Sequence, residues 1–173
     1  MAPAAALMGV VLPDAGSALA EGDIVSESAA IDLIARKLAE AKKPAVCPGP
    51  LVLWQCYENA APKAAALKAL AEACGAKILP MADYRAKRIN ADIEISPNHP
   101  NVTIMHHEID VCLFAGMHSH FANFSLRLIR GGTSCYTIAL CDHAASDEAM
   151  ISMRDVDVKT INAITEKIKG MKR

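Results

Sequence analysis

The chain has 173 residues, of which 53% are hydrophobic and only 4% aromatic, and its formal net charge is −1. This length suits one well-buried domain with an aliphatic core. The balanced charge gives no electrostatic attraction to nucleic acid or to an anionic membrane surface, and no apolar run reaches the roughly 18 residues that cross a bilayer. We therefore expect neither a nucleic-acid partner nor a membrane partner.

The N-terminal segment is apolar and lacks helical continuity. We interpret residues 1–24 as an arm and residues 25–173 as a single α/β domain. Pro13 and Asp14 interrupt the apolar run, and no basic segment precedes it, so a signal peptide is disfavoured. Exposed apolar side chains would favour aggregation, so we expect the arm to pack on the body of the protein or on another subunit.

The first helix is predicted over residues 29–42. Ser26 and Ser28 are N-cap candidates, and the apolar side chains that follow fall on one helical face. Pro44 stops this helix, and residues 45–47 then predict a short buried strand.

A second helix begins near Pro62 and ends near Cys74, where Gly75 suits the C′ position. Its apolar face consists of Ala66, Leu67, Leu70, Ala71 and Cys74. Residues 51–56, which precede this helix, fit either a helix or an extended segment. Residues 76–79, which follow it, predict a second strand.

The second half of the chain continues the alternation of helices and strands. In order, we predict a short helix at 82–90, a short edge strand at 102–105, a strand at 111–115, a helix at 121–130, a strand at 135–140 and a closing helix from 153 or 154 to 171. The side chains of helix 121–130 predicted to face the core are Phe121, Phe124, Leu126 and Leu128. Such alternation predicts a three-layer α/β domain with a mostly parallel sheet and helices on both faces.

The six cysteines are interpreted as free thiols. Cys47, Cys112 and Cys135 fall in predicted buried strands, where cysteine acts as a small hydrophobic residue. No C-x-x-C pair is present, which argues against a zinc knuckle or an iron–sulfur motif. A reducing cytoplasm fits this usage better than a disulfide framework does.

Two apolar strands end in glycine, at Gly49 and Gly116. Ligands of parallel α/β sheets lie outside the carboxyl ends of the strands, so both glycines occupy positions that a ligand would approach. Neither the G-x-G-x-x-G nor the P-loop fingerprint is present. Position alone therefore supports the hypothesis of a nucleotide or flavin site, with FAD as the candidate flavin, at Gly49, Pro50, Gly116, His118 and Asp142. A turn-forming role for Asp142 is the alternative.

A metal site is a second hypothesis for the same edge of the sheet. His118 and His120 follow one predicted strand, and Cys141 and His143 follow another. Residues at i and i+2 of an extended loop point to opposite sides, so a shared metal is not the expected arrangement. We favour polar loop residues, a helix cap or an interface role for the two histidines.

Other polar clusters give weaker indications of chemistry. An acid–base dyad of His106 or His107 with Asp110 would lie at the amino end of a strand, so a solvated or partner-facing turn is favoured. Ser119 and Ser125 lack a nucleophile elbow, and we assign no catalytic residue.

An aromatic pair follows the first glycine turn. Trp54 and Tyr57 fit an interface anchor or ordinary core.

Four segments, in this order, resemble the small epsilon subunit (beta in some gene nomenclature) of the archaeal carbon monoxide dehydrogenase/acetyl-CoA synthase complex. They are residues 41–49, 75–80, 109–116 and 149–153. The central domain of thiamine-diphosphate enzymes resembles the same pattern. Both groups share a Rossmann-like fold of the deoxyhypusine-synthase-like NAD/FAD-binding type, and the resemblance implies that fold here.

The resemblance also implies a function. It implies a non-catalytic accessory subunit in an α2ε2-type hetero-oligomer of an anaerobic oxidoreductase complex. The large partner would hold the nickel–iron–sulfur chemistry, and the small subunit would stabilise it and assist electron transfer to a flavin. The alternative is a flavin- or nucleotide-binding module related to the thiamine-diphosphate enzymes.

Overall fold

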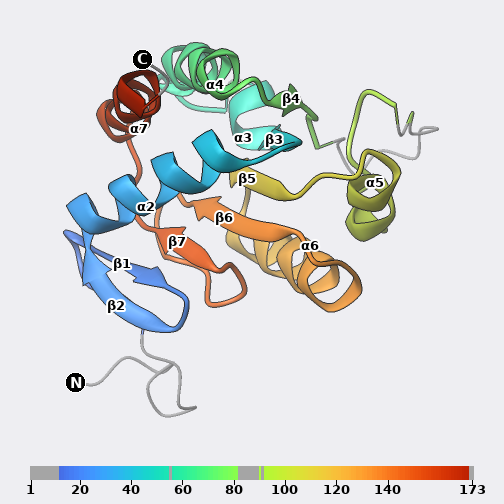
Figure 1. The fold of residues 1–173 in the computed structure, drawn as a ribbon, viewed down its shortest axis with the longest axis horizontal. Helices are drawn as coiled ribbons and strands as arrows, with labels where there is room; N and C mark the ends of the chain where they lie inside the picture. Colours follow the sequence, from blue (N-terminus) through green and yellow to red (C-terminus); the bar gives the residue numbers. More distant parts are fainter. Residues whose placement is uncertain (1–11, 55, 82–89, 91, 172–173) are drawn as a thin grey trace.

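The computed structural model describes residues 12–54, 56–81, 90 and 92–171 (Figure 1). The strands in this part of the chain are β1 (Ser17–Ala20), β2 (Asp23–Ser26), β3 (Pro44–Pro48), β4 (Lys77–Ile78), β5 (Val111–Ala115), β6 (Tyr136–Leu140) and β7 (Ile151–Met153). The helices are α2 (Glu27–Glu40), α3 (Pro50–Leu53), α4 (Ala60–Cys74), α5 (Pro100–His106), α6 (Ser119–Gly132) and α7 (Val158–Met171).

All seven strands form one sheet in the order β2-β1-β7-β6-β5-β3-β4. The neighbours from β7 to β4 pair in parallel, whereas β1 is antiparallel to both β2 and β7. The prediction of a mostly parallel α/β sheet is therefore confirmed. If the parallel strands β3, β4, β5, β6 and β7 are numbered 1 to 5 in chain order, their order across the sheet is 2-1-3-4-5. This is the order of flavodoxin-like doubly wound sheets, and the direction in which successive strands are added reverses between β3 and β5.

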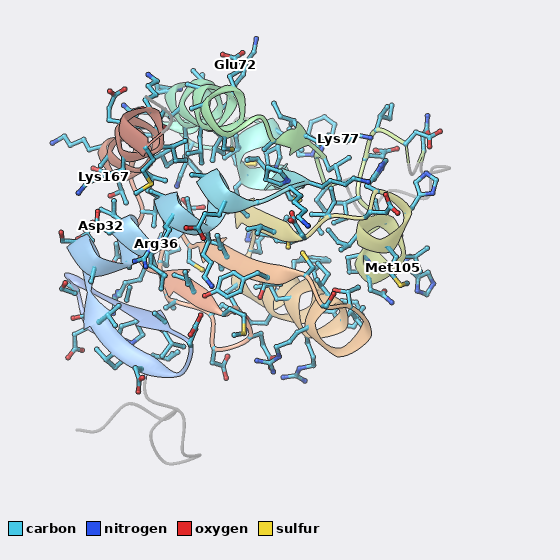
Figure 2. All side chains as sticks on the ribbon, viewed as in Figure 1. Asp32, Arg36, Glu72, Lys77, Met105 and Lys167 are labelled. Atoms are coloured by element: carbon cyan, nitrogen blue, oxygen red, sulfur yellow. The ribbon has the colours of Figure 1, made fainter. Side chains whose placement is uncertain are left out.

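Helices cover both faces of the sheet, and a separate hydrophobic core fills each side. Helices α2, α4 and α7 enclose one core with alternate strand residues such as Val46 and Leu113. Helices α5 and α6 enclose the other with Cys112 and Phe114. An ion pair also joins α2 to α7 on the first side. Its groups, Asp32 Oδ1 and Lys167 Nζ, are 2.6 Å apart, and Figure 2 labels both residues.

The first two predicted helices are confirmed. Ser26 caps α2, because its Oγ accepts a hydrogen bond from Ala29 N at 3.2 Å. Gly75 ends α4 in the left-handed conformation, with φ of 74°, which a residue without Cβ adopts at little cost. The ambiguous segment before α4 contains the short helix α3, which begins at Pro50.

The predicted edge strand at residues 102–105 is wrong, because this segment is part of α5. Pro100 occupies the first turn, where its missing N–H costs no hydrogen bond. Ile104 faces the core, whereas Val102 and Met105 are about half exposed, and Met105 lies on the outer side of the helix in Figure 2. The apolar spacing was therefore that of a helix buried on one side.

The N-terminal region contributes to the sheet. Strands β1 and β2 form a hairpin that pairs with β7, so the segment from Ser17 to Ser26 extends the sheet by two strands. Residues 1–11 and the predicted helix at 82–90, apart from residue 90, lie outside the described residues. The division into an arm and a domain stays a prediction.

The inward face predicted for α6 is wrong for Phe124 and confirmed for Leu126, whereas Phe121 and Leu128 are only partly buried. Phe124 is 51% exposed, and the side chains that reach the sheet are Ala122, Ser125, Leu126 and Ile129. Small residues at two of these positions let the helix approach the sheet closely. The closing helix begins at Val158, later than predicted, because residues 151–153 form β7.

Among the helices that the structure describes, none combines the length and the apolar character needed to cross a membrane.

Candidate functional site

A cavity of about 660 Å³ lies at the carboxyl ends of β5, β6 and β7. Its walls come from α3, the start of α4 and the segment between them, from the loop after β5 and the start of α6, and from the loops that follow β6 and β7 up to the start of α7. This is the edge of the sheet at which doubly wound proteins hold their ligands. A second cavity, of about 410 Å³, lies at the opposite edge beside Glu108 and Ser134.

A buried ion pair forms one side of the larger cavity. Lys63, on α4, is only 3% exposed, and its ammonium group pairs with the carboxylate of Asp142, which follows β6. Lys63 Nζ also donates a hydrogen bond to Val156 O at 2.8 Å. Tyr57 Oη donates to the second carboxylate oxygen of Asp142 at 3.1 Å. Each buried charge is therefore compensated, as burial requires.

The phenol of Tyr57 acts only as a hydrogen-bond donor at neutral pH. Burial raises the pKa of Tyr57 above its ordinary value, and the negative charge of Asp142 raises it further. The proton therefore stays on Tyr57 and holds the carboxylate in place.

The predicted glycines lie side by side at the switch in strand order. Gly49 N donates to Ala115 O at 2.8 Å, and Leu51 N donates to Gly116 O at 3.0 Å. A Cβ added to Gly49 would lie 2.3 Å from Met117 Cγ. The two glycines thus allow the loops after β3 and β5 to pack directly against each other.

The predicted site residues divide into two groups. His118 and Asp142 line the cavity, whereas Gly49, Pro50 and Gly116 lie outside its lining. A cofactor-binding role for these five residues stays a prediction, and the structure brings only two of them to the same cavity.

The hypothesis of a metal site finds no support. The rings of His118 and His120 stack on each other with centroids 5.9 Å apart. Burial raises the pKa of Cys141 to about 11, so its thiol stays protonated at neutral pH. Among residues 12–54, 56–81, 90 and 92–171, no three His, Cys, Asp or Glu side chains are grouped so that they could hold a metal ion.

The polar turn before β5 shows no acid–base dyad with Asp110. The carboxylate of Asp110 accepts hydrogen bonds from Lys42 N and Lys43 N, at 2.7 and 2.9 Å. His106 Nε2 lies 3.0 Å from a carboxylate oxygen of Asp92 instead. These contacts agree with the favoured interpretation of a solvated turn.

The aromatic pair separates in the structure. Trp54 is 54% exposed at the end of α3, which excludes the core interpretation for this residue. Tyr57 is partly buried and lines the cavity.

The predicted buried cysteines are confirmed. Cys47, Cys112 and Cys135 are each at most 7% exposed. Burial raises the pKa of Cys47, and a hydrogen bond with Cys135 together with burial raises that of Cys112. Protonated, buried thiols are poor nucleophiles, so Cys47 and Cys112 act as core, and Cys135 is buried in the same hydrophobic cluster.

Lys63 is the principal residue that the sequence analysis missed. It lies three and four positions before Ala66 and Leu67, and therefore on the apolar face of its helix. The signal available in the sequence was a lysine on the apolar face of a predicted helix. A charged residue on a buried face needs a buried partner of opposite charge.

The sheet order and the cavity define an α/β protein of the doubly wound class, with an opening at the edge where such proteins bind ligands. The family model described as CO dehydrogenase beta subunit/acetyl-CoA synthase epsilon subunit matches residues 10–168, so the chain belongs to this family. The resemblance found in the sequence is thereby confirmed. Membership implies a hetero-oligomeric partner within a CO dehydrogenase/acetyl-CoA synthase complex. Comparison with individual curated proteins gives no match.

Proposed function

We propose that this chain is a non-catalytic accessory subunit that binds and stabilises the large nickel–iron–sulfur subunit of an anaerobic CO dehydrogenase/acetyl-CoA synthase complex, in an α2ε2-type assembly. The observation that carries the proposal is the family match over residues 10–168. In this proposal the large subunit holds the metal clusters, and the present chain contributes binding surface.

Exposed large apolar side chains support an association role. Leu53 ends α3 and is 42% exposed, Trp54 follows it and is 54% exposed, and Phe124 on α6 is 51% exposed. Aromatic side chains are enriched in protein interfaces, where they lose contact with water.

Co-purification tests this proposal. When an affinity-tagged form of this chain is co-expressed anaerobically with the large subunit, we expect the untagged large subunit to be retained. CO oxidation should appear only in fractions that contain the large subunit. CO oxidation by the isolated chain, or a large subunit that passes through unretained, would contradict the proposal.

A flavin- or nucleotide-binding module related to the central domain of thiamine-diphosphate enzymes is the second candidate. The flavodoxin-like strand order and the cavity at the carboxyl edge favour it. Assistance of electron transfer to a flavin belongs to the first proposal, and a flavin site of this kind would serve it. Titration calorimetry with FAD and with ADP tests it, and the absence of binding heat for both would count against it.

The diphosphate of FAD does not fit the residues at the switch in strand order. The space beside Gly49 is filled by Met117, and a Cβ at Gly116 would lie 2.3 Å from Val52 Cγ2. These glycines therefore leave no open backbone cradle for phosphate.

A further inference from the structure

We draw no further inference here: the strongest candidate, the cavity at the carboxyl ends of β5, β6 and β7, has carboxylates that are each held by groups of the protein itself and exposed polar side chains that point to no particular ligand.

Discussion

Gly116 combines positive φ with close packing against a neighbouring loop. Its φ is 68°, and an added Cβ would lie 2.3 Å from Val52 Cγ2. We expect Gly116→Ala to lower the free energy of unfolding by about 3 kcal/mol, from backbone strain together with overpacking. Gly131→Ala, on the open side of α6, should be neutral or stabilising by about 0.5–1 kcal/mol. Urea unfolding of both variants checks this, and equal stabilities would contradict it.

Lys63 and Asp142 depend on each other because both are largely buried. We expect Lys63→Met to destabilise the fold by about 3 kcal/mol, since it leaves the Asp142 carboxylate without its cation. The double variant Lys63→Met/Asp142→Leu should recover most of this loss, because no unpaired charge remains. Chemical denaturation of the single and double variants measures the difference. A double variant no more stable than Lys63→Met would show that the pair is not the cause.

Tyr57 makes stability depend on pH in the alkaline range. Its pKa in the folded state is raised above the unfolded value of about 10, so the folded protein retains a proton that the unfolded chain releases. The contribution is fully present below pH 10 and is lost as the pH rises toward the folded pKa. Between about pH 9 and 11, the wild-type chain should therefore lose stability more steeply than Tyr57→Phe in urea unfolding. Parallel pH profiles would contradict this.

The sequence identified part of the candidate site. His118 and Asp142 follow predicted strand ends, and both line the cavity because parallel strands bring their carboxyl ends to one edge. Lys63 was missed because its partner is 79 positions away in the chain, and local spacing does not reveal such pairing. The packing of Gly49 against Gly116 could not be predicted from local sequence either, because it depends on β3 and β5 being neighbours in the sheet.

At the scale of elements, the N-cap of α2 is a local determinant of stability. Ser26→Ala removes the hydrogen bond from Ala29 N to Ser26 Oγ, and we expect a loss of about 1 kcal/mol. Ser28→Ala lies inside the same helix and on its exposed side, so it should be neutral or slightly stabilising. Thermal unfolding followed by circular dichroism compares the two variants. A larger loss for Ser28→Ala would mean that Ser26 is not the cap.

Elements with strong periodicity were predicted better than short ones. Helices α2 and α4 carry sustained apolar faces with caps, and β3 and β5 are continuous apolar runs. Strands β1, β2 and β7 have only three or four residues each, so they offer almost no periodicity. Strand β1 pairs with β7, which is distant in the sequence. These strands therefore depend on the tertiary structure, which brings the two segments together.

At the scale of the molecule, alternation of helices and strands predicted parallel pairing but left the strand order open. The order places β3 beside β5 and puts the glycine-ended strands at the centre of the parallel region. It also places the cavity beside the ends of β5, β6 and β7, displaced from the glycines. The family match connects this architecture with a multisubunit complex.

The central claim is that the chain functions as a subunit of that complex, and the native mass of the co-expressed proteins tests it most directly. We predict one assembly that contains this chain and the large subunit in equal numbers, as an α2ε2-type complex requires. Two separate species, with this chain absent from every assembly that contains the large subunit, would contradict the claim.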